Sequence, residues 1–69
     1  MKVVRLKLEE TLNRLGLSRY ALAAKTGISY QIIDKYYKNK ANRYDKFTLA
    51  RICDALDCDI SDILELYDE

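Results

Sequence analysis
Proline and histidine are absent from the 69-residue sequence, which also has only two glycines and two cysteines. Without histidine the chain lacks a common general base and metal ligand, and two cysteines alone match no zinc-binding pattern. They are also too few for the disulfide scaffold of a small secreted protein. No apolar run reaches the roughly 20 residues of a membrane-spanning helix, and the basic N-terminus lacks the apolar core of a signal peptide. We therefore expect a cytoplasmic protein that contacts no membrane.

Valine is also scarce, at two residues, whereas leucine, alanine and charged residues are abundant. This choice of residues favours helices, and a chain with 49% apolar and 33% charged residues is expected to fold around a core. A chain this short buries only about 60% of the surface that its unfolded form exposes, which leaves no room for an enzyme-sized cavity. We expect no enzymatic activity, no small-molecule substrate, no cofactor and no metal site. Cys53 and Cys58 are expected to be buried free thiols.

The net charge of +1 conceals a strong asymmetry along the chain. Residues 1–44 carry ten basic side chains against three acidic ones, a net charge of +7, while residues 45–69 carry two against eight, a net charge of −6. Such a distribution predicts one surface that attracts a polyanion and another that stays soluble or meets a partner. Chance segregation of solvated charges is the alternative.

Apolar spacing predicts a first helix over residues 5–15, ended by Gly16 in a left-handed conformation. The apolar residues that define its buried face are Val4, Leu8, Leu12 and Leu15. Residues 4–8 also alternate between apolar and basic side chains, which is typical of a short strand. A short extended start therefore remains an alternative for the N-terminal residues.

Capping residues delimit two short helices that follow. Ser18 begins a helix over residues 19–26 that Gly27 ends, and Ser29 begins another that extends from Tyr30 to about Lys38. Two short helices joined by a tight glycine-containing turn are the geometry of the DNA-binding helix-turn-helix. Its expected buried residues are Leu22, Ile28, Ile33 and Tyr36, with Ala23 as the small residue where the helices cross.

The second half of the chain predicts a basic loop and two more helices. Residues 39–44 show no period, and Asp45 begins a helix that runs to Ala55 or Leu56. Asp59, with Asp62 three residues later, caps a last turn or two that runs through Leu64. The prediction is an all-α, five-helix fold that forms a single domain over residues 1–69.

A familiar pattern runs through the segment Leu17-Ser18-Arg19-Tyr20-Ala21-Leu22-Ala23-Ala24-Lys25-Thr26-Gly27-Ile28-Ser29. With Ala55-Leu56 and residues 60–64, it resembles the lambda-repressor-like (Cro-type) helix-turn-helix family of bacterial and phage regulators. The resemblance implies a compact five-helix domain whose third helix lies in the DNA major groove. The chain departs from the family where Arg19 replaces the common glutamine, where Asn39 replaces a glycine after the third helix, and where the following loop lacks proline.

The third expected helix has one polar face. At 100° per residue, an arc about 140° wide contains Tyr30, Gln31, Asp34, Lys35 and Lys38. Gln31 can pair with adenine, Lys35 can donate to guanine, and Tyr30 can touch a thymine methyl group or a phosphate. Asp34 can accept from a cytosine amino group or pair with Lys38. We expect base contacts from Tyr30, Gln31, Asp34 and Lys35; the alternative is an ordinary solvated helix face.

Phosphate contacts are expected at the start of the second helix, where free backbone N–H groups attract anions, and along the basic stretch after the third helix. The expected phosphate-binding residues are Ser18, Arg19, Lys38, Lys40, Asn42 and Arg43. Five of the six tyrosines lie in the basic half, as in surfaces that stack single-stranded bases. Packing explains most of them better, because Tyr36 faces the expected core.

These observations predict sequence-specific binding of double-stranded DNA by a small transcriptional regulator, most simply a repressor that blocks polymerase by occupying a site. The alternative is a protein-interaction module, such as an antitoxin or a phage accessory factor. One short recognition helix makes few base contacts, so we expect a homodimer on two half-sites one helical turn apart. The pairing surface is expected at Leu64, Leu66 and Tyr67 or at Val4 and Leu6; the alternative is a monomer whose last residues fold back on the first helix.

Overall fold

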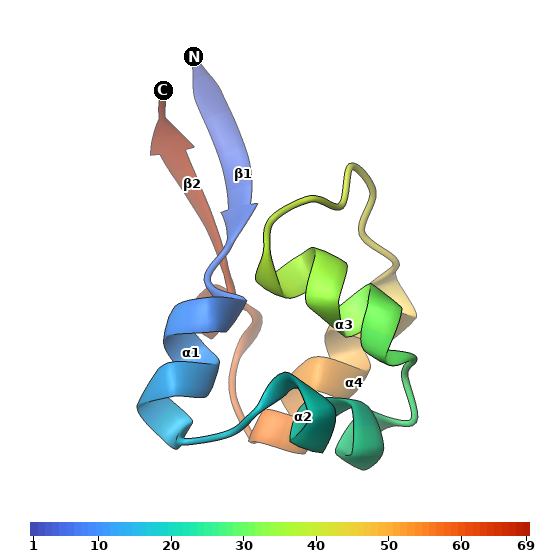
Figure 1. The fold of residues 1–69 in the computed structure, drawn as a ribbon. Coiled ribbons are helices and arrows are strands. Elements are labelled where there is room, and N and C mark those ends of the chain that lie inside the picture. The colour runs from blue at the N-terminus through green and yellow to red at the C-terminus, as the bar shows by residue number, and fades with distance from the viewer.

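The computed structural model describes residues 1–69 as four α-helices, one 3₁₀ turn and a two-stranded antiparallel sheet (Figure 1). The elements in chain order are β1 (Lys2–Leu6), α1 (Leu8–Leu15), α2 (Arg19–Thr26), α3 (Tyr30–Tyr37), α4 (Lys46–Leu56), the 3₁₀ turn η1 (Ile60–Asp62) and β2 (Leu64–Asp68). The prediction of a mostly helical fold with a central helix-turn-helix is therefore confirmed. The prediction of an all-α, five-helix fold is wrong at both ends of the chain.

The two ends pair with each other as strands. β1 and β2 run antiparallel in a register that sets Lys2 opposite Asp68 and Leu6 opposite Leu64. The first helix consequently begins at Leu8 and not at residue 5, and the expected last helix is reduced to the turn η1. Side chains that alternate along a short segment suit a strand once a partner satisfies its backbone groups, and each end supplies that partner to the other.

The helix boundaries in the middle of the chain follow the predicted caps. The hydroxyl of Ser18 accepts a hydrogen bond from the backbone N–H of Ala21 at 3.0 Å, and that of Ser29 accepts from Ile32 at 3.4 Å. The Asp45 carboxylate caps α4 in the same way. Gly27 ends α2 with a φ of 73°, in the left-handed region that residues with a Cβ resist, as predicted.

The core lies where the four helices and the base of the sheet meet. Its buried apolar residues are Leu6, Leu8, Leu12, Leu22, Ile28, Ile33, Tyr36, Ile52, Leu56 and Ile63. The four buried positions predicted for the helix-turn-helix are all among them. Val4 and Leu15 were expected in the core but are 46% and 45% exposed, because Val4 lies in the projecting sheet and Leu15 is the last residue of α1.

The two cysteines lie at the C-terminal end of α4, Cys53 within the helix and Cys58 just after it. Both are free thiols and half-buried, so the expectation of free thiols is confirmed and that of full burial is not. The backbone N–H of Cys58 donates to the carbonyl of Cys53 at 3.0 Å, as the turn after a helix requires. Burial is the main reason why the pKa of Cys58 is raised to about 11, which leaves it almost wholly protonated near neutral pH.

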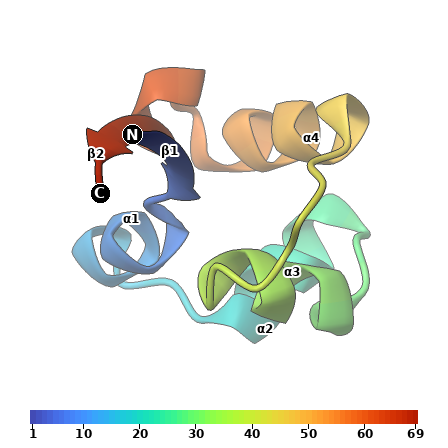
Figure 2. The ribbon, with the colours of Figure 1, turned by 90° about the horizontal axis from the view of Figure 1, so that it is seen from above.

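The sheet projects from one end of the helical body, with the two chain termini side by side (Figure 1). Viewed from above, α1 lies next to the sheet, α3 lies beside α1, and the segment after α3 crosses to α4 (Figure 2). Asn39 joins these parts, because its side-chain amide donates to the Leu6 carbonyl at 2.9 Å and accepts from the Leu6 N–H at 2.7 Å. Its own φ is 57°, in the left-handed region that glycine adopts easily.

Candidate nucleic-acid interface

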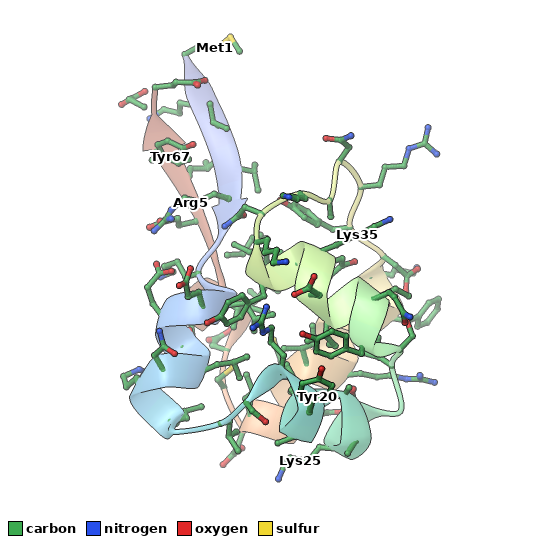
Figure 3. The ribbon with its side chains drawn as sticks, in the orientation of Figure 1. Met1, Arg5, Tyr20, Lys25, Lys35 and Tyr67 are labelled. Carbon is green, nitrogen blue, oxygen red and sulfur yellow. The ribbon has the colours of Figure 1, made fainter.

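The helix-turn-helix leaves one side of α3 open to solvent. Ile33 and Tyr36 point into the core and fix the helix against its neighbours, while Gln31 and Lys35 are exposed. Lys35 lies on the outer side of α3 and Tyr20 on α2, both away from the sheet that carries Arg5 and Tyr67 (Figure 3). Two of the four expected base-contacting side chains are therefore exposed on the polar face of α3, as its periodicity predicts.

An open hollow lies between α3 and the segment 39–45, and three of its lining side chains are cationic. Lys35, Lys40 and Arg43 line it and form no ion pair. The remaining lining residues are Ile32, Tyr36, Ala41, Asn42, Tyr44, Asp45 and Thr48. We call this surface the α3–loop hollow. Its unneutralised cations and the Asn42 amide can bind the oxygens of a polyanion.

Tyr36 and Tyr44 fix the far wall of the α3–loop hollow. The backbone N–H of Asp45 donates to the Tyr36 hydroxyl at 3.1 Å, so the buried tyrosine also holds the start of α4. The Tyr44 ring meets the Tyr36 ring edge-on, with 5.6 Å between the ring centroids. The basic loop therefore rests on a fixed aromatic pair, which places Lys40, Asn42 and Arg43 beside α3.

Asp34 forms a second charged group on the same face, which we call the Asp34 cluster, together with Arg19 and Lys38. Its Oδ1 accepts from Arg19 at 2.6 Å, and its Oδ2 lies 3.2 Å from the Lys38 ammonium. Burial alone would raise the pKa of the Asp34 carboxyl, but the hydrogen bonds from Lys38 and Arg19 outweigh burial and lower it. The expected pairing with Lys38 is present. The pairing with Arg19, on a different helix, was not expected.

Aromatic rings surround the Arg19 guanidinium. Its Cζ atom lies 4.4 Å from the centroid of the Tyr37 ring and 6.0 Å from that of Tyr30. Tyr30 in turn stacks on Tyr20, with 4.3 Å between centroids and 11° between the ring planes. Tyr20 is 69% exposed and was not among the predicted site residues. The sequence did place Tyr20 in the first turn of α2, and in the fold this turn packs against the first turn of α3.

Ser18 lies at the N-terminal end of α2. Its role as a cap is confirmed by the hydrogen bond from Ala21, and its contact with phosphate stays a prediction. No group of three or more histidine, cysteine or acidic side chains is arranged to hold a metal ion. None of the helices is both long and apolar enough to span a membrane.

A comparison with family models identifies this arrangement. The model of the Cro/C1-type helix-turn-helix DNA-binding domain matches residues 7–69. The chain belongs to the Cro/C1-type helix-turn-helix family. It is thus a DNA-binding domain, as the resemblance in the sequence implied, and its family is typically not enzymatic. No curated protein and no solved structure matches the sequence significantly. The match begins after β1, so the N-terminal strand lies outside the part that defines this Cro/C1-type domain.

Proposed function
We propose that residues 1–69 form one sequence-specific DNA-binding unit that acts in the cytoplasm as a transcriptional repressor by occupying its site, without a cofactor. The observation that carries the proposal is the exposed polar face of α3, where Gln31 and Lys35 lie beside the unpaired cations of the α3–loop hollow. An α-helix of this kind fits the major groove, where side chains distinguish base pairs. The cations of the loop then face the phosphates that flank the groove.

The side chains divide into two roles in this proposal. Gln31 and Lys35 contact base edges, and Tyr30, stacked on Tyr20, contacts a thymine methyl group or a phosphate. Phosphates are held by residues of the α3–loop hollow and by the N-terminus of α2. These phosphate-binding residues are Ser18, Lys40, Asn42 and Arg43. Arg19 and Lys38, which were also predicted to contact phosphates, are left out of this set because both pair with Asp34. The carboxylate of Asp34 faces a cytosine amino group.

The experiment is selection of a preferred duplex from a random-sequence library, followed by alanine substitution. Gln31→Ala or Lys35→Ala is expected to cost about 1 to 3 kcal/mol on the selected duplex and to relax discrimination at one position. Lys40→Ala is expected to weaken all duplexes alike and to reduce the salt slope by about 0.9. Lys25→Ala is a matched control, because Lys25 is also exposed but lies at the opposite end of α2 from Tyr20 (Figure 3). Unchanged affinity and preference in Gln31→Ala would disprove the assigned groove face.

Salt separates this function from that of a protein-interaction module. If Lys40 and Arg43 each neutralise one phosphate, log K falls with log salt at a slope of about −1.8 per protomer. An apolar contact with a protein partner has no such dependence. Binding that stays constant from low to high salt would therefore favour the interaction module.

We further propose that the repressor binds as a homodimer paired through its sheet. The eight residues of α3 offer few base contacts, and two-fold pairing adds a second set one helical turn away. Leu6 is buried, which removes it from the expected pairing surface, whereas Val4 and its cross-strand partner Leu66 are 46% and 63% exposed. Analytical ultracentrifugation with a palindromic duplex tests the proposal, with Leu66→Lys as the variant expected to be monomeric. One protein per duplex at saturation would exclude the dimer.

A further inference from the structure
Asp34 places a negative charge where a DNA-binding surface needs positive charge. It lies on the polar face of α3 between Tyr30 and Lys38, and each of its carboxylate oxygens is engaged by a different cation. Arg19 and Lys38 are two of the side chains expected at phosphates. Within the Asp34 cluster, their two positive charges are reduced to a net charge of one.

The pair with Arg19 is held more firmly than a surface ion pair. The side chains of Arg19 and Asp34 are only 32% and 23% exposed, and the guanidinium lies against the Tyr37 ring. By contrast, the side chains of Lys2 and Asp68 are 69% and 75% exposed and their charged atoms are 3.8 Å apart. Partial burial and the aromatic face both strengthen the Arg19 contact relative to such an exposed pair.

We propose that Asp34 determines specificity by withholding Arg19 and Lys38 from DNA phosphates, an inference that rests on the proposed DNA-binding function. Binding to random DNA comes almost entirely from neutralised phosphates, so two withheld cations lower it directly. Base contacts from Gln31 and Lys35 do not depend on those cations. The Asp34 carboxylate also repels the acceptor atoms of guanine and thymine, whereas a cytosine amino group can donate to its remaining lone pairs. Asp34 therefore weakens binding least at a site that presents cytosine opposite it.

The test is Asp34→Asn, which removes the charge but keeps the shape. The probes are a random-sequence duplex pool and the duplex that the wild-type chain selects from it, each about two helical turns long. The salt slope on the random pool is expected to steepen by about 0.9, because the variant restores one unit of positive charge to the cluster. If the proteins bind equally at 1 M salt, this raises affinity at 0.1 M by about 8-fold. The ratio of selected to random affinity falls, and the preference for cytosine opposite residue 34 is lost.

Asp54→Asn is the matched control for net charge. Asp54 lies exposed on α4 and forms no ion pair, so this variant makes the same charge change away from the cluster. It is expected to leave the slope and the sequence preference unchanged. If Asp34→Asn and Asp54→Asn gave the same slope and the same preference, the proposal would be overturned.

Lys38→Ala gives a second test, and its measurement in the wild-type background does not require Asp34→Asn to fold. In the wild-type background the alanine is expected to reduce the salt slope by less than Lys40→Ala does, because Lys38 shares the Asp34 carboxylate with Arg19. In the Asp34→Asn background Lys38→Ala is expected to lower the slope by about 0.9. A wild-type Lys38 that contributes as much to the slope as Lys40 would refute the proposal. Failure of the wild-type chain to select any sequence would refute the proposed function instead.

Discussion
Asn39 offers a sharp test of how α3 is joined to the sheet. Its amide makes two hydrogen bonds with the backbone of Leu6, and its φ of 57° lies in the left-handed region. Each hydrogen bond contributes a net amount of about 0.5 to 1.5 kcal/mol, so the pair contributes about 1 to 3 kcal/mol. Glycine at this position loses both bonds but relieves up to about 1 kcal/mol of backbone strain. Asn39→Gly is therefore expected to lower the free energy of unfolding by about 1.5 kcal/mol, within a range of about 0 to 3 kcal/mol.

Asn39→Ala separates the two contributions. Alanine also loses both hydrogen bonds and resists the left-handed region, so it is expected to be about 1 kcal/mol less stable than Asn39→Gly. Urea unfolding followed by circular dichroism measures the stability of both variants. An unchanged slope of the unfolding free energy against urea concentration indicates that the fold is unchanged. Hydrogen exchange of the Leu6 amide is expected to accelerate in both. If Asn39→Gly were as stable as the wild type, with normal protection at Leu6, the amide would contribute nothing to the junction.

Three further outcomes test the fold and the Asp34 cluster. Gly27→Ala and Gly16→Ala are expected to destabilise the protein about equally, by roughly 1 kcal/mol each. Neither site has an atom within 4 Å of an added Cβ, so the cost is conformational. If urea unfolding showed that the two variants differ in stability by well over about 1 kcal/mol, this reasoning would be contradicted. Ile33→Ala, at a fully buried position, is expected to cost about 2 to 5 kcal/mol, and its exposed neighbour Ile32→Ala far less, as thermal melting measures. Because the pKa of Asp34 is lowered in the folded state, its contribution to stability is present above the ordinary carboxyl pKa and is lost as pH falls through the lowered value. Acid unfolding of Asp34→Asn is expected to be less steep, and an identical acid transition would refute this.

Local features were sufficient to predict the centre of the molecule. The caps at Ser18, Ser29 and Asp45 act within three residues, so the sequence next to each helix end contains what determines it. The pairing of Asp34 with Lys38 is similarly local, at four residues along one helix. The exposed face of α3 followed from its period alone.

Interactions between distant segments were not predictable in this way. Residues 4–8 fit both a helix and a strand, and the choice depends on a partner strand at residues 64–68. The ion pair between Arg19 and Asp34 depends on how α2 crosses α3, which no spacing along the chain specifies. The amide of Asn39 compensates for the missing glycine through its contact with β1, a compensation that only the assembled fold reveals.

The pairing of β1 with β2 also has a consequence for how the protein is made. A ribosome synthesises residues 2–6 before residues 64–68, so β1 has no partner strand until β2 has been made. The helix-turn-helix can collapse earlier, because α2 and α3 are adjacent in the sequence and their contacts are local. In the interval, β1 has an unpaired edge that can associate with other nascent chains. The charged side chains of Lys2 and Arg5 on that strand oppose such association until β2 arrives.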